Sequence, residues 1–158
     1  MRIIEDVKLD FDDVLIVPKR SVLSSRNDVD LVREYTFRNS GVSYKGIPII
    51  ASNMDGVGTI RMANSLSKFK CMTALIKHYW NSEIQLWRAD KSDNLCSNDR
   101  WMYSIGISND DLEKFKEWER FINPVLGFQY VIIDVANGYS QKFLDFVSKF
   151  REQFPKVV

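Results

Sequence analysis

Short apolar runs alternate with stretches of helical periodicity from residue 46 onward. The runs cover 47–52, 71–76, 101–105 and 128–135, and the helical patterns that follow them cover 59–68, 81–89, 108–121 and 139–153. This alternation predicts parallel strands joined by crossover helices. An eight-unit barrel of this kind needs about 250 residues, so the 158 residues of the chain supply about four of its units. Residues 156–158 read as the start of a fifth strand.

The residues before this alternation read as β-rich. A turn and a short strand are expected within 7–17, and a pair of edge strands at 29–32 and 35–37, before a turn at Ser40-Gly41. We therefore expect an α/β fold, the N-terminal half of a TIM (β/α)8 barrel. It would form one partial domain over 1–158, with a β segment at 1–45 and about four βα units at 46–158. Because half a barrel leaves open strand edges and an uncovered inner face, we expect another chain to cover them.

Composition and charge exclude several classes of function. The chain has 22 Lys and Arg against 21 Asp and Glu, a net charge of +1, so there is no electrostatic reason to bind nucleic acid or an anionic membrane. No apolar run approaches the ~18 residues that span a bilayer, and no signal peptide is expected. Cys71 and Cys96 are too few for a disulfide framework or a zinc site. We read both as reduced thiols of a cytoplasmic protein, and no metal site is expected.

The loop at 52–58, Ser-Asn-Met-Asp-Gly-Val-Gly, is the first candidate site. It lies between a predicted strand and a predicted helix, and ligands of parallel α/β folds bind at this edge. Its small residues would let a ligand approach the backbone, and the helix that follows would offer N–H groups to an anion. The alternative is that the two glycines serve only the turn, since such a pair is a weak signal.

Charged residues follow two more of the predicted strands. Lys77, with His78 beside it, could hold a phosphate or an oxygen, or transfer a proton if its pKa is lowered. The alternative is a solvated lysine and a histidine hydrogen-bonded within a loop. Asp134 could bind a ribose hydroxyl, an amide or a metal, or it could cap the next helix. Near the N-terminus, Arg26 could bind a phosphate through its planar fork or lie in a surface turn.

Five separate segments resemble GMP reductase, of the GMP reductase and inosine monophosphate dehydrogenase superfamily, in the family's order. They are 8–21, 25–31, 47–59, 77–79 and 134–140. The similarity extends over nearly the whole chain and is weakest at 81–103. It implies a TIM barrel that forms tetramers and reduces GMP to IMP and ammonia with NADPH.

The same resemblance implies roles for individual residues. The positions that match NADPH-contacting residues are Ser25, Arg26, Lys77, Asp134, Val135 and Ala136. Met54 and Asp55 lie in the loop that approaches the purine nucleotide, and Lys77 is a possible catalytic residue. Cations such as Arg26 and Lys77 suit a cofactor with phosphates, and small side chains let nicotinamide approach the purine for hydride transfer.

Other features of the family have no counterpart in this sequence. The family's catalytic cysteine, which bonds covalently to the purine, matches neither Cys71 nor Cys96, and no counterpart is found for the potassium-binding loop or the catalytic flap. Gly56 stands where the family usually has threonine, Ile76 where it has histidine, and Trp80 where it has serine. We therefore do not expect the chain to reduce GMP by itself.

Three hypotheses follow from these features. The chain could be half of a GMP reductase that becomes active when a C-terminal half completes the barrel. It could instead be a non-catalytic relative that binds a full-length GMP reductase, or a nucleotide, as a regulatory module. The third hypothesis is a self-associating half barrel, in which two copies form one closed barrel without catalysis.

Overall fold

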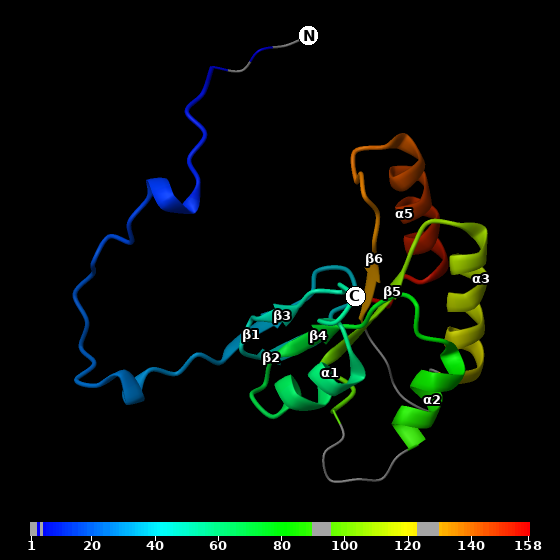
Figure 1. The fold of residues 1–158 in the computed structure, drawn as a ribbon, viewed down its shortest axis with the longest axis horizontal. Coiled ribbons are helices and arrows are strands. Elements are labelled where there is room, and N and C mark those ends of the chain that lie inside the picture. Colours follow the sequence, from blue (N-terminus) through cyan, green and yellow to red (C-terminus); the bar gives the residue numbers. More distant parts are fainter. Residues whose placement is uncertain (1–2, 4, 90–95, 123–129) are drawn as a thin grey trace. The chain divides into compact units, whose positions relative to one another are not determined.

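A computed structural model describes residues 3, 5–89, 96–122 and 130–158. The chain divides into two units, Met1–Asp30 and Leu31–Val158. Every strand in the described part of the chain belongs to the second unit. Figure 1 shows the order of the elements along the chain.

The first unit contains two single-turn 3-10 helices, Phe11–Asp13 and Arg26–Asp28. The strand that we expected within 7–17 is wrong, because the unit has no strand among its described residues. The acidic run explains the difference. The Asp10 side chain accepts a hydrogen bond from the Phe11 N–H, and the Asp13 side chain accepts one from the Asp10 N–H. These local bonds form a turn where the apolar pattern predicted an extended segment.

The second unit begins with an antiparallel hairpin, β1 (Arg33–Thr36) and β2 (Ser43–Gly46). The predicted pairing of 29–32 with 35–37 is therefore wrong. The strand near 35–37 is β1, and its partner β2 follows it in the chain rather than preceding it. The predicted turn at Ser40-Gly41 is the cause. Gly41 has a φ of 69°, a left-handed conformation that glycine adopts readily, and its N–H donates to the Phe37 carbonyl.

Four parallel strands then form one sheet in the order β3-β4-β5-β6. Their bounds are Ile50–Ala51, Met72–Ala74, Trp101–Ile105 and Val131–Ile133. The helices between and after them are α1 (Ile60–Ser67), α2 (Asn81–Ala89), α3 (Asn109–Glu117) with a π-helical turn at Trp118–Ile122, and α5 (Gln141–Gln153). Neighbours in sequence are neighbours in the sheet, which confirms the predicted alternation of parallel strands and helices.

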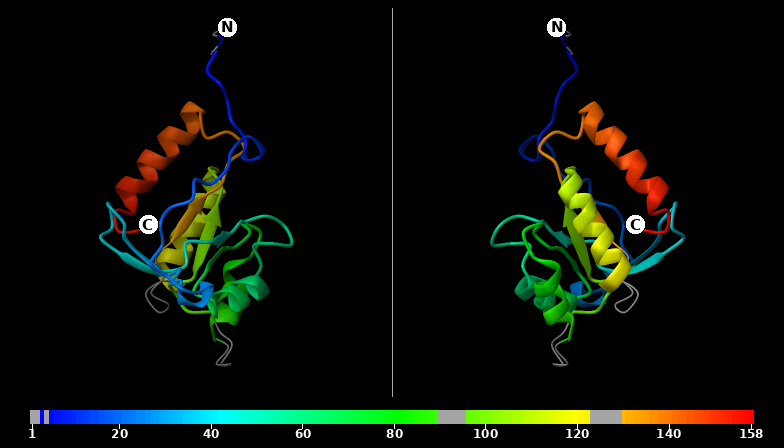
Figure 2. Two further views of the ribbon diagram at one scale, coloured as in Figure 1. Left: turned by 90° about the vertical axis from the view of Figure 1, so that its left-hand side faces the viewer. Right: turned by 90° about the vertical axis from the view of Figure 1, so that its right-hand side faces the viewer.

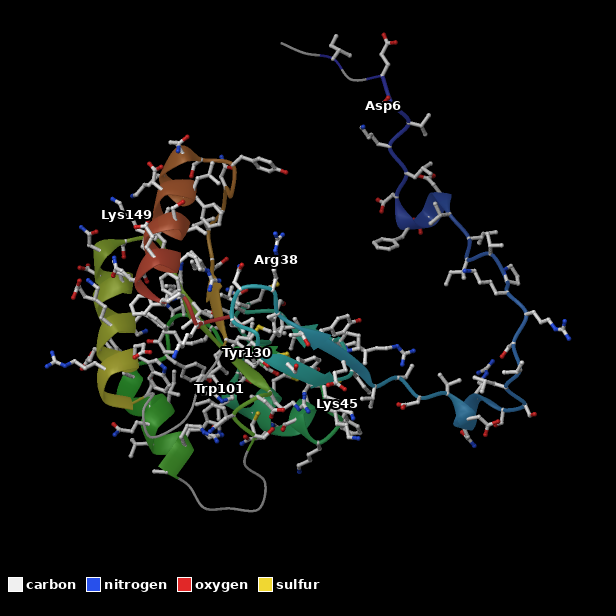
Figure 3. The ribbon with its side chains drawn as sticks, turned by 180° about the vertical axis from the view of Figure 1, so that it is seen from behind. Asp6, Arg38, Lys45, Trp101, Tyr130 and Lys149 are labelled. Atoms are coloured by element: carbon white, nitrogen blue, oxygen red, sulfur yellow. The ribbon has the colours of Figure 1, made fainter. Side chains whose placement is uncertain are left out.

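The helices cover one face of the sheet and enclose the main core (Figures 1 and 2). Its centre is aromatic: Trp101 and Tyr103 of β5 are almost fully buried, and both contact Trp118. Phe115 of α3 and Phe150 of α5 pack beside them, with ring centroids 5.1 Å apart. Figure 3 shows Trp101 and Tyr130 inside the fold, whereas Lys45 and Lys149 project outward.

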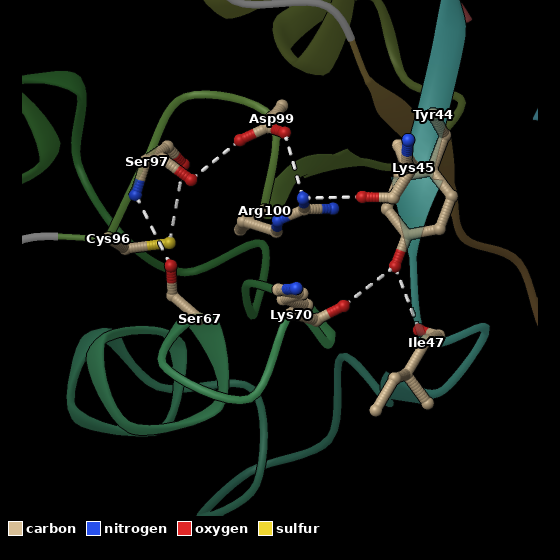
Figure 4. Close-up of polar contacts among 9 residues, drawn as sticks. All are labelled: Tyr44, Lys45, Ile47, Ser67, Lys70, Cys96, Ser97, Asp99 and Arg100. Atoms are coloured by element: carbon tan, nitrogen blue, oxygen red, sulfur yellow. Dashed lines mark hydrogen bonds and ion pairs between the residues drawn. The ribbon is translucent and has the colours of Figure 1, made fainter. Parts of the chain in front are cut away.

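The hairpin packs against the opposite face of the sheet, near the strands' N-terminal ends. Tyr44 of β2 clusters with Met72 and Tyr130, and Phe37 meets the Tyr130 ring edge-on at 5.7 Å. The Tyr44 hydroxyl lies within hydrogen-bonding distance of the carbonyls of Ile47 and Lys70, at 2.8 and 3.0 Å (Figure 4). Arg100 donates to the Lys45 carbonyl and lies over the Tyr44 ring, so the hairpin closes this end of the sheet.

The rest of this inner face is open. A cavity of about 430 Å³ lies between the hairpin and the strands, and its lining includes Ile50, Met102 and Val158. At the edge of β6, the Val131 N–H donates to the Val158 carbonyl at 2.9 Å. Val157 packs into the helix-side core and Val158 toward the inner face, which is the alternation of a strand. One backbone hydrogen bond thus joins Val158 to the edge of β6, but the structure has no strand at 156–158, so the fifth strand expected there stays a prediction.

Candidate functional site

The predicted strand-end residues of the second unit gather at one edge of the sheet. The loops after β3, β4, β5 and β6 all leave the sheet at its C-terminal edge, because the strands are parallel. The Ile76 N–H donates to the Gly58 carbonyl at 2.9 Å, and the Asp134 N–H donates to the Ile105 carbonyl at 2.7 Å. The first bond joins the loop after β3, the first loop, to the loop after β4, the second loop. The other joins the C-terminal end of β6 to that of β5. The edge thus brings Met54 and Asp55, Lys77, and 134–136 into one region.

The loop after β3 is a compact turn with an exposed tip. The Met54 carbonyl accepts hydrogen bonds from the N–H groups of Val57 and Gly58, and the side chains of Met54 and Asp55 are exposed. Gly56, at the tip, has a φ of 76° and open space where a Cβ would lie. At Gly58 a Cβ would lie 2.4 Å from the Ala74 carbonyl oxygen. Gly58 therefore serves the packing of the loop on β4, and only Gly56 leaves its surroundings open to a ligand.

The start of α1 is less available to an anion than the sequence suggested. The Thr59 hydroxyl accepts a hydrogen bond from the Met62 N–H at 3.1 Å, and the Tyr79 hydroxyl accepts one from the Ile60 N–H at 3.3 Å. Two of the N–H groups of the first turn are therefore engaged within the protein. The Tyr79 contact also ties the second loop to the first helix.

The loop after β4 presents an exposed Lys77 side chain and an exposed His78. Its backbone is held from α3, because the Lys114 ammonium donates to the carbonyls of Lys77 and Tyr79 at 3.0 and 2.6 Å. Trp80, 71% exposed, precedes α2, and its carbonyl accepts from the Ile84 N–H. Trp80 is thus the residue at the N-cap position of α2. The Asn81 side chain instead donates inward to Lys114 and Glu117.

Asp111 forms a fixed negative charge near Lys77. Its carboxylate accepts hydrogen bonds from the Ser108 N–H at 3.2 Å and the Ser108 hydroxyl at 2.5 Å, in a capping box that begins α3. Burial acts to raise the pKa of Asp111, but the hydrogen bonds from Ser108 and Gly106, with the charge of Lys77, outweigh it and leave the pKa below 3.8. The Lys77 ammonium therefore lies in the field of a fixed carboxylate.

Replacing Asp111 by asparagine is expected to destabilise the fold by about 1 kcal/mol at pH 7, because it weakens the cap of α3. The carboxylate's pKa is lower in the folded state, so its stabilisation is complete above pH 3.8 and is lost as the pH falls through the folded value. Urea unfolding at pH 7, 5 and 3 measures the difference between wild type and Asp111→Asn, which should shrink at the lowest pH. A difference that stays constant with pH would show that the charge is not responsible.

The loop after β6 leaves the Asp134 carboxylate available. None of the hydrogen bonds in the described part of the chain occupies it, and the helix that follows is capped by Ser140, whose hydroxyl accepts from the Phe143 N–H at 3.3 Å. The alternative in which Asp134 caps that helix is therefore wrong. Val135 is half-buried and Ala136 exposed. Residues 128 and 129 of the predicted strand lie outside the described residues.

Ser25 and Arg26 belong to the first unit, whereas the strand-end residues belong to the second. Ser25 caps the 3-10 helix Arg26–Asp28: its hydroxyl accepts from the Asn27 N–H at 3.2 Å, and its N–H donates to the Asp28 carboxylate at 2.9 Å. Both Ser25 and Arg26 are exposed. This geometry agrees with the alternative in which Arg26 lies in a surface turn.

Both cysteines are free thiols and both are buried. Cys71 is a buried residue beside β4, and Cys96, although it follows a polar stretch of sequence, is only 1% exposed and packs in the main core. Burial raises the pKa of the Cys96 thiol, which is unfavourable for a nucleophile. Within the described residues, no three His, Cys, Asp or Glu side chains gather in a way that could hold a metal ion.

Sequence reasoning missed two residues of this region. Lys114 lies on a helix whose pattern indicated only a solvated polar face, and its partner carbonyls are 35 and 37 residues away in the chain. The Ser104 hydroxyl, in β5, is buried and has no hydrogen-bond partner among the described residues. No signal in a single sequence marks either one, because the hydrogen bonds of Lys114 and the burial of Ser104 both depend on residues distant along the chain.

No helix in the described part of the chain could cross a lipid bilayer. The longest of them, α5, has 13 residues, whereas a spanning helix needs about 20.

Comparison with known proteins extends these observations. The family of IMP dehydrogenase / GMP reductase domains matches residues 8–158. GMP reductases from two Escherichia coli strains, O1:K1 / APEC and K12 / DH10B, are each 51% identical to the chain over 155 residues. This alignment covers 98% of the chain but only 43% of each relative. The chain therefore spans less than half the length of these relatives.

The fold agrees with this result. The crystal structure of inosine 5′-monophosphate dehydrogenase from Legionella pneumophila is similar over 90% of this chain and 40% of its own length, with a TM-score of 0.66 and 24% identity. That protein is a TIM barrel, so the predicted N-terminal half of a TIM barrel is confirmed. The 151 matched residues, the half barrel and the loops at its C-terminal edge lead to one conclusion. The chain belongs to the IMP dehydrogenase/GMP reductase family.

Proposed function

We propose that this chain supplies the N-terminal half of a GMP reductase, which reduces GMP to IMP and ammonia with NADPH. Identity of 51% to GMP reductases over 98% of the chain carries this proposal. The grouping of Lys77, Asp55 and Asp134 at one sheet edge supports it, because that edge is where barrels of this kind bind their ligands. The chain would act as one half-barrel domain in which 1–45 precede the βα units.

The residues at this edge fit NADPH in their chemistry. Lys77 is an exposed cation that can attract phosphate or a polarised oxygen, and the unoccupied Asp134 carboxylate can accept hydrogen bonds from an amide or a hydroxyl. Ala136 is small and exposed, so its side chain would not obstruct a planar ring. In the first unit, Arg26 could by itself bind a phosphate through its planar guanidinium, with Ser25 beside it in the chain. When bound, NADPH supplies the hydride, and these residues hold and orient it.

The nucleotide would approach the first loop. Met54 and Asp55 project from its exposed tip, and Gly56 leaves free space around them. Neither Cys71 nor Cys96 is exposed enough to attack a purine. The nucleophilic cysteine, the potassium site of the family and the flap would therefore come from the rest of the barrel, and an oligomer like that of the family forms part of the proposal.

The open inner face indicates how the barrel would be completed. Val158 already occupies the free edge of β6, so a second copy could pair its β3 with that edge only by displacing 157–158. A polypeptide that continues this pairing would extend the sheet without such displacement. We therefore favour a complementing C-terminal half over a barrel closed by two copies. Two buried free thiols suit a reducing compartment, and we place the activity in the cytoplasm.

Complementation tests the proposal. The chain is mixed with the part of E. coli GMP reductase that follows the matched region, and the absorbance of NADPH is followed after GMP is added. We expect NADPH oxidation only in the mixture, and we expect Lys77→Met to lower it at least tenfold by removing a charge that contacts the cofactor. The matched control is Lys45→Met, an exposed lysine of the hairpin, which should keep full activity.

Two outcomes would contradict the proposal. A mixture that forms a complex by light scattering but never oxidises NADPH would favour the non-catalytic binding module. A chain that forms only dimers of itself and ignores the added half would favour the self-associating half barrel.

A further inference from the structure

We propose that Lys114 is a positioning residue, which fixes the backbone of 77–79 and so aims the Lys77 side chain at the cofactor edge. This inference rests on the proposed function insofar as it assigns Lys77 to NADPH. The anchoring of the loop stands on the contacts of Lys114 alone.

Lys114 donates to two carbonyls of the loop that carries Lys77. Its ammonium lies 3.0 Å from the Lys77 carbonyl oxygen and 2.6 Å from that of Tyr79. Loop carbonyls have no ladder partner of their own, and a partly buried carbonyl without a donor is unfavourable. One ammonium with three donors satisfies both carbonyls and holds them at a fixed separation.

The position of Lys114 is itself fixed by two neighbouring elements. The Asn81 side chain, at the start of α2, donates to the Lys114 carbonyl at 3.1 Å and to the Glu117 carboxylate at 3.2 Å. The Tyr103 hydroxyl of β5 bonds to the Asn81 amide oxygen at 2.5 Å, and the Lys114 ammonium lies 5.8 Å from the Tyr103 ring centroid. The anchor therefore connects the loop to the buried centre of the sheet.

Burial lowers the pKa of Lys114, and the charges of Asp111 and Glu83 oppose that effect. Partial burial of a charged lysine costs free energy unless hydrogen bonds compensate. Here the compensating bonds go to backbone carbonyls, so the lysine also fixes the geometry of the loop. The opposite side of the loop has an anchor as well, since the Ile76 N–H bonds to Gly58 and the Tyr79 hydroxyl to the Ile60 N–H. Lys77 lies between the two anchors, so its Cα has a defined position while its ammonium remains exposed.

Amide hydrogen exchange on the full 158-residue chain tests the anchor. In wild type the Trp80 N–H donates to the Glu83 carboxylate at 2.7 Å, which gives a protected probe inside the loop. Lys114→Met keeps the apolar stem and removes the donors, so the exchange of the Tyr79 and Trp80 amides should accelerate on the order of tenfold or more. Lys114→Arg, which keeps N–H donors, should restore much of the protection.

Two controls separate this effect from general loss of stability. Lys116→Met removes a lysine of the same helix whose ammonium pairs with Glu113, and its loop exchange should match wild type. The Tyr103 amide, bonded to the Tyr130 carbonyl, reports global opening. Unchanged Tyr79 and Trp80 exchange in Lys114→Met, or acceleration of Tyr103 by the same factor, would overturn the inference.

Titration with NADPH, followed by its fluorescence, then links the anchor to the site. We expect Lys77→Met and Lys114→Met both to weaken NADPH binding about tenfold or more, and Lys116→Met to leave it unchanged. If Lys77→Met binds as wild type does, or wild type does not bind, the cofactor assignment fails for this chain while the exchange data still decide on the anchor. If only Lys77→Met weakens binding, Lys114 has no positioning role.

Discussion

Replacing Trp101 by alanine is expected to destabilise the fold by about 3–5 kcal/mol, because it removes one of the two largest fully buried side chains of the core. Trp101 is fully buried in β5, with its ring edge-on to those of Trp87 and Trp118 at 5.4 and 5.9 Å. The indole thus joins α2, the turn after α3 and the sheet. No neighbouring side chain can fill the space without leaving its own contacts.

The size of this effect matters because domains are stable by only about 5–15 kcal/mol. Chemical unfolding followed by circular dichroism should show the midpoint moving far toward zero denaturant, and the melting temperature should fall by on the order of 10 °C. Trp80→Ala is the matched control. Trp80 is 71% exposed and its backbone bonds survive the substitution, so the free energy of unfolding should change by less than about 0.5 kcal/mol. Equal effects of the two substitutions would contradict the assignment of Trp101 to the core.

The parts of the fold that the sequence predicted well are those with local causes. The strand at 101–105 and the helix at 81–89 appear with the predicted bounds, because alternation and helical spacing are properties of neighbouring residues. The turn at Ser40-Gly41 was also predicted, since glycine marks positive φ. Of the helix predicted over 108–121, the α-helical part ends at Glu117 and a π-helical turn follows. No residue type in this segment predicts that change.

The failures have non-local or competing causes. The apolar residues 14–17 suggested a strand, but a strand needs a partner, and the first unit offers none among its described residues. Cys96 follows a polar stretch, yet the N–H groups of Cys96 and the Trp87 indole share the Asn64 side chain as acceptor, each at 3.1 Å, and this brings the thiol into the core. Both results depend on which segments meet in space.

The candidate site likewise has features that the sequence predicts and features that depend on distant contacts. Parallel strands place their loops at one edge, so the sequence was sufficient to bring Met54, Lys77 and Asp134 together. It could not show that the first helix already uses its N–H groups, or that a lysine of α3 fixes the second loop. Those are contacts between side chains and distant backbone, and they decide how much of the edge a ligand can reach.

Replacing Gly58 by alanine is expected to disturb this edge more than any other change in the first loop. A Cβ there would lie 2.4 Å from the Ala74 carbonyl oxygen and 2.9 Å from the Asn53 Cα, both of which are backbone atoms that cannot rotate away. The Gly58 backbone is also held on both sides, because its N–H donates to Met54 and its carbonyl accepts from Ile76. Relief of the clash must therefore shift the loop, at a cost of about 2–3 kcal/mol.

Gly56→Asn is the matched control for Gly58→Ala, because its φ of 76° suits asparagine and nothing lies within 4 Å of the added Cβ. Denaturant unfolding should place it within about 1 kcal/mol of wild type. The Gly58 carbonyl accepts a hydrogen bond from the N–H of Ile76, the residue before Lys77. Displacement of the first loop must therefore also move the second. We therefore expect Gly58→Ala to accelerate the amide exchange of Ile76, and Gly56→Asn to leave it unchanged. If Gly58→Ala proves as stable as wild type, the close packing of the two loops, and with it the shared site, is wrong.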